Sequence, residues 1–458
     1  MSGAALIRCA ELDGERCDVR IAGGRIAAIG RDLPGRAGEA SLDARGGALL
    51  PGLHDHHLHL LAWAASLASV PCGPPGVRTA AELRAALAAA APRADGWLRG
   101  TGYHESVAGP LDRHALDTLA PGRRVRVQHR SGALWCLSSP AVEALGLDAG
   151  ADAEGVERDA RGRATGRLFD LDAWLRERLP PASPPPLAPV AALLAACGVT
   201  GVTDATPTTG PAELARFAEL PQRVVAMGPL GLATRGAHKI LLRERALPDP
   251  DALAERVRAA HAEGRPVAIH CVTRAELVLA ACALADAGAR AGDRIEHAAV
   301  APPELVALLA RLPVTVVTQP NFVRERGDAY LGSVEARDLP WLYRCRGFLD
   351  AGVALGGGSD APFGRPDPWL AMQAAADRRS EAGVALGERE ALSPERALGL
   401  FTSAPEAPGG PPRRVAPGAP ADLCLLDRPW KQARDRLEAA CVAATLRAGA
   451  ILRRGAPE

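Results

Sequence analysis

Short apolar runs recur along this chain, and most are followed by a stretch in which apolar residues repeat at helical spacing. Eight such runs lie at residues 47–53, 199–204, 223–230, 237–242, 267–270, 293–297, 314–318 and 353–355. Runs of this length are typical of buried strands, and the segments 274–287 and 303–312 that follow two of them have a helical pattern. Strands that alternate with helices indicate a parallel sheet. Eight such units predict an α/β fold, a (β/α)8 TIM barrel, with its chemistry at the carboxyl ends of the strands.

The chain between the first and second runs is far longer than a barrel loop requires. It extends from about residue 62 to 190 and ends in a proline-rich stretch at 179–186 that is typical of a connector. We therefore expect a barrel over residues 50–414, with an inserted subdomain at 62–190 capping its active site.

The first apolar run leads into a cluster of histidines, His54, His56, His57 and His59. Side chains two apart on a strand share a face, so Asp55, His57 and His59 are expected to project together, while His54 and His56 point the other way. Two imidazoles on one face at a strand end form half of a divalent-metal site.

Lysine occurs only twice in the chain, at positions 239 and 431, among 54 basic residues. Arginine cannot replace lysine where the chemistry needs a primary amine, because a guanidinium stays protonated. An amine can react with CO2 to give a carbamate, an anionic oxygen ligand able to bridge two metal ions. Lys239 lies in the fourth apolar run and is the candidate for this chemistry; the alternative is a lysine whose stem packs and whose charge reaches solvent.

Other polar residues follow later strands and two strand-like runs of the insertion. His270, His297, Gln319 and Asp360 follow the fifth to eighth runs. Candidate substrate-binding residues are Tyr103, His104, His129, Arg130 and Gln319. For the four in the insertion, the alternative is an internal hydrogen-bonded network, because buried polar groups must pair whatever their function.

On these residues the chain resembles the amidohydrolase superfamily, within it the branch of N-substituted formamide deformylases and amidohydrolase 3 proteins. The segments 392–398 and 418–423 match the usual ending of that family. The resemblance implies one or two divalent ions, with zinc expected, and a carbamylated lysine. The implied ligands are His57, His59, Lys239, His270, His297 and Asp360. Where the branch usually has Gly-His, this chain has Gly132-Ala133, so we expect it either to recognise a different substrate or to recruit His129 or His104 in place of that histidine.

The resemblance also implies that both chain ends join in a small β-sandwich, residues 1–49 plus 415–458. The sequence offers strands for it at each end. Residues 18–21 and 25–29 flank a Gly-Gly turn and predict a hairpin, and 422–426 and 442–446 add two strand candidates.

Three functions are compatible with this ligand set. The first is hydrolysis of a C–N bond (amide, N-formyl or N-acyl, not peptide) in a small molecule by a metal-activated hydroxide, with Asp360 as the catalytic proton carrier. The second is deamination, or hydrolysis of a cyclic amide, on a heterocycle; deaminases of the superfamily generally lack the strand-four lysine, so Lys239 argues against deamination. The third is a non-catalytic protein that kept the fold, but such proteins lose ligands and this chain retains all six.

Composition narrows the partners to a small-molecule substrate. A net charge of +1 provides no field to attract nucleic acid or an anionic membrane. The amino terminus lacks a signal-peptide pattern and no apolar segment is long enough to span a bilayer, so we expect a cytoplasmic enzyme. The ten cysteines show no CxxC spacing and are expected to be buried small hydrophobes rather than nucleophiles. A homodimer stays open, because the sequence does not determine the oligomeric state.

Overall fold

A computed structural model describes residues 5–93, 95–149, 153–180 and 183–455. The chain divides into two compact units. Residues up to 60 together with those from 187 onward form the first unit, and Leu61–Pro186 form the second. The second unit begins one residue before the range expected for the insertion, 62–190, and ends four residues before its end.

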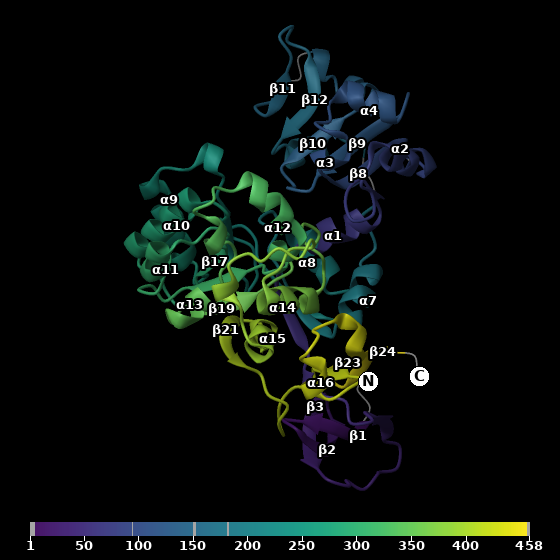
Figure 1. Cartoon of the computed structure of the whole chain (residues 1–458), viewed down its shortest axis with the longest axis vertical. Coiled ribbons are helices and arrows are strands. Elements are labelled where there is room, and N and C mark those ends of the chain that lie inside the picture. The colour runs from purple at the N-terminus through teal and green to yellow at the C-terminus, as the bar shows by residue number, and fades with distance from the viewer. Residues whose placement is uncertain (1–4, 94, 150–152, 181–182, 456–458) are drawn as a thin grey trace. The chain divides into compact units, whose positions relative to one another are not determined.

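The first unit contains eight parallel strands. They are β6 (Leu53–Leu58), β13 (Val199–Asp204), β14 (Arg223–Ala226), β15 (His238–Leu241), β16 (Val267–Cys271), β17 (Arg294–His297), β18 (Thr315–Thr318) and β19 (Ala354–Gly357). Figure 1 labels β17 and β19 among them. β14, β13 and β6 pair in one sheet and β15 to β19 in another, and a parallel bridge between Gly228 and His238 links β14 to β15. At the other edge, the amide of Asp360 donates to the carbonyl of His57 at 2.8 Å. This is a TIM-barrel-like α/β fold.

Helices follow most of these strands. They are α7 (Ala188–Ala196), α8 (Pro211–Phe217), α9 (Pro250–Ala262), α10 (Arg274–Ala287), α11 (Pro303–Leu309), α12 (Asn321–Ser333), α13 (Arg346–Asp350), α14 (Pro368–Asp377) and α15 (Pro394–Thr402). α10 begins where Thr273 and Glu276 form a reciprocal capping box, and it ends at Gly288, whose φ of +77° is the left-handed conformation that glycine tolerates. Local capping thus explains why this helix matches the expected range 274–287. None of the described helices is long and apolar enough to cross a membrane.

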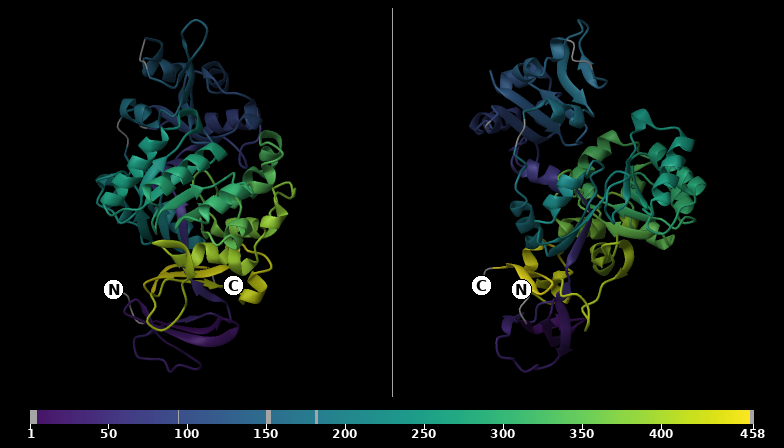
Figure 2. Two further views of the ribbon diagram at one scale, coloured as in Figure 1. Left: turned by 90° about the vertical axis from the view of Figure 1, so that its left-hand side faces the viewer. Right: turned by 180° about the vertical axis from the view of Figure 1, so that it is seen from behind.

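Strands from both chain ends lie together in the first unit (Figure 2). One sheet has the order β3-β2-β1-β4, formed by β1 (Ala5–Leu12), β2 (Glu15–Ala22), β3 (Arg25–Gly30) and β4 (Ala40–Asp43). The other has the order β24-β23-β22-β5, formed by β5 (Leu49–Pro51), β22 (Leu423–Leu426), β23 (Val442–Arg447) and β24 (Ala450–Arg454). Ile7 and Ile21 from the first sheet and Leu423 and Leu446 from the second are buried in one hydrophobic core. The two ends of the chain therefore stabilise each other. The remaining elements of this region are β20 (Ser403–Ala404), β21 (Ala407–Pro412) and α16 (Trp430–Ala433).

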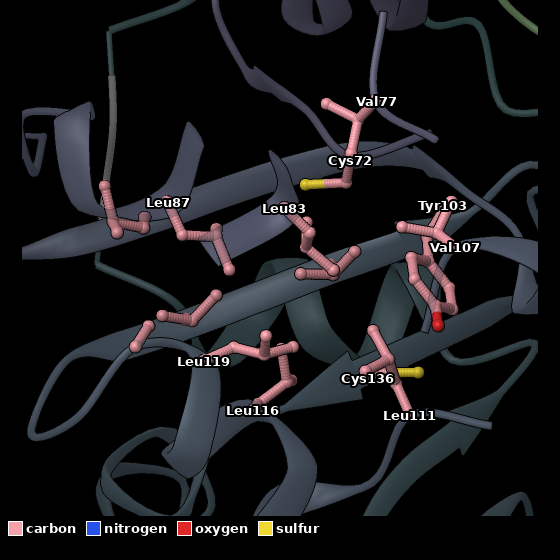
Figure 3. Packing of buried hydrophobic residues seen from close by; sticks show 14 of the residues in the cluster. Cys72, Val77, Leu83, Leu87, Tyr103, Val107, Leu111, Leu116, Leu119 and Cys136 are labelled. Atoms are coloured by element: carbon pink, nitrogen blue, oxygen red, sulfur yellow. The ribbon is translucent and has the colours of Figure 1, made fainter. Parts of the chain in front are cut away.

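The second unit is built on a six-stranded sheet of order β11-β12-β10-β9-β8-β7. Its strands are β7 (Val70–Pro71), β8 (Trp97–Tyr103), β9 (Arg124–His129), β10 (Leu134–Leu137), β11 (Val156–Arg158) and β12 (Ala164–Phe169). Its helices are α1 (Leu60–Leu67, which begins at the last residue of the first unit), α2 (Ala80–Ala89), α3 (Glu105–Ala108), α4 (Arg113–Leu119), α5 (Ser139–Ala144) and α6 (Asp172–Arg178). Leu83 and Leu87 of α2 and Leu116 of α4 pack in a core of this unit's own (Figure 3). That the insertion caps the barrel mouth stays a prediction.

Candidate metal centre

Three side chains from the carboxyl ends of β6 and β19 converge. His57 Nε2 lies 3.5 Å from Asp360 Oδ1, and His59 Nε2 lies 3.4 Å from the same oxygen. One ligand atom from each residue lies within 4.8 Å of the other two, a spacing that would suit a metal ion. His57 is buried, whereas the His59 side chain keeps 15% of its surface exposed, so the group is reachable from outside.

The other two histidines of β6 face away from this group. His54 Nε2 hydrogen-bonds to Thr203 Oγ1 at 2.9 Å, and His56 Nε2 to Ser403 Oγ at 3.0 Å. This is the arrangement that the strand alternation predicted. Both imidazoles are buried, and their ring centroids lie 4.6 Å apart, whereas His57 and His59 form a second pair with centroids 5.5 Å apart.

Asp55 shares the face of His57 and holds the junction between β6 and the end of β19. Its Oδ1 accepts the backbone amides of Ser359 at 3.0 Å and His57 at 3.1 Å. Burial raises the pKa of Asp55 to about 6, against these hydrogen bonds, which lower it.

Two more predicted ligands continue this cluster, His297 beside His57 and His270 beside His297. The ring centroid of His297 is 4.7 Å from that of His57 and 4.5 Å from that of His270. Burial lowers the pKa of His57 and His297 well below the ordinary value, and burial together with the charge of Lys239 lowers that of His270 to about 3. These imidazoles are therefore neutral, the form in which histidine binds metals.

Two residues of the cluster adopt left-handed backbone conformations, His297 as the last residue of β17 and Asp360 three residues after β19. His297 has a φ of +70° and Asp360 a φ of +56°. Such conformations cost free energy for residues with a side chain and concentrate at functional sites. Here these conformations occur in two of the candidate ligands, near the carboxyl ends of β17 and β19.

Lys239, on β15, is only 4% exposed. Among the described residues its Nζ has no hydrogen-bond partner. Burial lowers the pKa of this amine, and the nearby carboxylate of Glu296 opposes that effect. A buried amine without an acceptor is costly to the folded chain. Four histidines, a carboxylate and this orphaned amine form a donor set that fits a divalent-metal site.

Two residues that hold the imidazoles were not expected from the sequence. Thr206 Oγ1 lies 3.0 Å from His59 Nδ1, and a carboxylate oxygen of Glu296 contacts His57 Nδ1. Glu296 carries a detectable signal, because a charged residue is rare inside a buried parallel strand. Thr206 carries none.

Gln319, expected to contact substrate, is fully buried, and its Oε1 accepts a hydrogen bond from His297 Nδ1 at 2.7 Å. Its position suits orientation of a metal ligand.

The four candidate residues of the insertion gather at the ends of β8 and β9. Tyr103 is buried and its hydroxyl donates to the Gly109 carbonyl. The backbone amide of Arg130 donates to the Tyr103 carbonyl at 2.8 Å. The rings of His104 and His129 stack with centroids 6.0 Å apart. The structure brings these residues together within the second unit; their contact with a substrate stays a prediction.

Comparisons with known proteins agree with one another. The amidohydrolase family model Amidohydro_3 matches residues 41–453. The chain is 27% identical over 490 residues to the N-substituted formamide deformylase of Arthrobacter pascens, covering 90% of each protein. It is 25% identical over 441 residues to YtcJ of Bacillus subtilis (strain 168), which is named as an amidohydrolase, covering 79% of this chain and 80% of YtcJ. The solved structure of an uncharacterized metal-dependent hydrolase from Pyrococcus horikoshii OT3 shares its fold, with a TM-score of 0.69 and 19% identity over 93% of this chain and 97% of that one.

Proposed function

Because the chain belongs to the amidohydrolase family, we propose that it is a metal-dependent hydrolase cleaving a non-peptide C–N bond, an amide, N-formyl or N-acyl bond, of a small molecule. The observation that carries this proposal is the convergence of His57, His59 and Asp360 in the unit that buries Lys239 without a partner among the described residues. Similarity to a formamide deformylase across nine-tenths of the chain supports the bond type.

We assign the metal site to six residues from five strand ends. They are His57, His59, Lys239, His270, His297 and Asp360. Divalent ions bound there, zinc in the first instance, would polarise the scissile carbonyl and lower the pKa of a bound water from about 15.7 to about 7. The neutral state of the buried imidazoles supports this assignment, because each leaves a nitrogen lone pair available.

Lys239 would serve as a carbamate that bridges two ions. The neutral amine would add through Nζ to the carbon of CO2: an N–C bond forms, one C–O π bond opens to give the anionic oxygen, and the nitrogen releases one proton to solvent. The Lys239 amine, which has no hydrogen-bond partner among the described residues, would thereby become part of an anion that divalent ions attract. A protonated lysine would instead be repelled at close range by a divalent ion, strongly so in a site of low dielectric.

Asp360 is the proton carrier in this mechanism. Its Oδ1 faces His57 Nε2 and His59 Nε2, which leaves Oδ2 for proton transfer. The carboxylate accepts the proton of the attacking water and then delivers it to the departing nitrogen, which must be protonated to leave. The hydrogen bond from the Asp360 backbone amide to the His57 backbone carbonyl holds Asp360 beside β6.

The proposal is tested by measuring metal content together with a screen of N-formyl amines, N-acyl amino acids and cyclic amides. We expect one or two divalent ions per chain, amine release from the first or second group, and loss of turnover on chelation that added Zn²⁺ restores. Asp360→Asn should lower kcat about 10²- to 10⁴-fold. Asp367→Asn is a matched control, because that carboxylate caps α14 by accepting the amides of Trp369 and Leu370. Turnover that survives chelation, or release of ammonia from heterocycles alone, would refute the proposal.

A further inference from the structure

The fully buried carboxylate of Glu296 contacts two side chains, the guanidinium of Arg294 and the imidazole of His57. Both Glu296 oxygens accept from Arg294, which donates from Nε to Oε1 at 2.7 Å and from Nη2 to Oε2 at 3.2 Å. Oε2 also contacts His57 Nδ1. The same Arg294 Nη2 donates to the backbone carbonyl of His56 at 2.8 Å. Arg294 and Glu296 are therefore anchored to β6 at two points.

Glu296 differs in kind from the partners of the other ligand histidines. His59 Nδ1 faces the hydroxyl of Thr206, and His297 Nδ1 faces the side-chain amide of Gln319. A hydroxyl can donate or accept, and an amide can turn over to present its NH2 group in place of its oxygen, so neither partner excludes the other histidine tautomer. An ionised carboxylate only accepts. Among these three histidines, His57 alone has a charged partner, which accepts from Nδ1 through either of its oxygens.

We propose that Glu296 and Arg294 are a positioning pair that holds His57 as the Nδ1–H tautomer, so that its Nε2 lone pair is directed to the metal. The effect on metal binding rests on the proposed function, whereas the contacts among Glu296, Arg294 and His57 do not. Arg294 contributes by occupying both carboxylate oxygens and supplying the charge that offsets the buried anion. His57 Nε2 is the atom that lies 3.5 Å from Asp360 Oδ1, on the side where the other ligands gather.

Glu296→Gln is an unusually sharp probe of this pair, because it is isosteric and reverses one hydrogen bond. A glutamine has one acceptor oxygen, and Arg294 presents two donors to it. The oxygen therefore turns to Arg294 and the NH2 group turns to His57. Nδ1 must then accept, which moves the proton to Nε2 and removes the lone pair that would bind metal.

The primary readout is the tautomer of His57 in the metal-free protein. The chain has 11 histidines, and their side-chain ¹⁵N signals can be assigned with a His57→Asn variant. We expect a protonated Nδ1 and an unprotonated Nε2 at His57 in the wild type and in Glu296→Asp, and the reverse in Glu296→Gln. A wild-type His57 with its proton on Nε2 would overturn the proposal, whether or not the variants fold.

The second readout is zinc affinity at buffered free Zn²⁺. Glu296→Gln should weaken it about 10- to 100-fold, as loss of a hydrogen-bond partner of a metal-binding histidine does. Adding Arg294→Met to Glu296→Gln frees the introduced side-chain amide to turn its oxygen towards His57, so the double variant should regain at least part of the loss. A double variant that is no better than Glu296→Gln would show that the pair acts only through packing.

Glu390→Gln provides the matched control. Glu390 is also a buried glutamate bound to an arginine, with Arg344 Nε at 2.8 Å from its Oε1, and it accepts the backbone amides of Cys345 and Gly347. This variant should lose stability without altering the His57 signals or zinc affinity. The tautomer of His57 could reverse in Glu296→Gln as expected while neither the wild type nor any variant binds zinc. That result would refute the proposed function but not the positioning pair.

Discussion

Replacing Lys239 by methionine should stabilise the metal-free protein while destroying its metal site. Lys239 is 4% exposed and its Nζ has no hydrogen-bond partner among the described residues. Leaving a buried polar group unsatisfied costs about 1–3 kcal/mol, more if it is charged. Methionine has a side chain of similar length without the amine, so it retains most of the packing contacts. We therefore expect Lys239→Met to raise the free energy of unfolding by about 1–3 kcal/mol.

The assay is urea denaturation of both proteins after chelation, in buffer free of CO2, followed by circular dichroism. The midpoint should rise while the slope of the free energy against urea stays constant, because the surface exposed on unfolding is unchanged. Lys431→Met is the matched control, since the other lysine of the chain is exposed on α16 and its replacement should change stability by less than about 0.5 kcal/mol. If metal-free Lys239→Met were less stable than the wild type, Lys239 would have a structural role. If the variant still bound metal normally, the carbamate would be withdrawn.

Three further outcomes are expected. Lys239→Ala should lose metal and turnover together, and should recover part of both when short carboxylic acids occupy the place of the carbamate. A Lys239→Arg variant with wild-type metal content and turnover would show that only a cation was needed. Gln319→Leu should weaken zinc affinity about 10- to 100-fold by releasing His297; a raised KM at unchanged zinc affinity would instead support the substrate-binding prediction. Leu423→Ala should cost about 2–5 kcal/mol in urea denaturation by opening a cavity in the core shared by both chain ends, and faster proteolysis of residues 5–45 should accompany it, since those strands pack on the same core.

The predicted features that match the structure most closely are local ones. The range 274–287 matches α10 because Thr273, Glu276 and Gly288 are all readable as caps. The helix expected at 303–312 ends earlier, at Leu309. No comparable C-terminal glycine marks its end in the sequence, and helix ends of this kind are set by packing.

The amino-acid composition indicated the C-terminal boundary of the insertion, whereas packing determines its extent as a compact unit. The proline-rich stretch at 179–186 marked where the insertion ends, and the structure divides the chain at Pro186. The six-stranded sheet inside it was not predicted, because short strands separated by irregular loops leave little periodicity. Its independence comes from its own buried core, which includes Leu83, Leu116 and Val127.

Sequence was sufficient to establish which side chains of the first barrel strand point together. Alternation along a strand has a period of two residues, so His57 and His59 could be separated from His54 and His56 without knowing any neighbour. The sequence also singled out Lys239, because a rare primary amine in an arginine-rich chain is visible as composition. The contacts of Glu296 with His57 and of Gln319 with His297 became apparent only in the folded chain. Those contacts join strands whose relative register depends on how the eight strands pair, and register is a property of the whole sheet rather than of either segment.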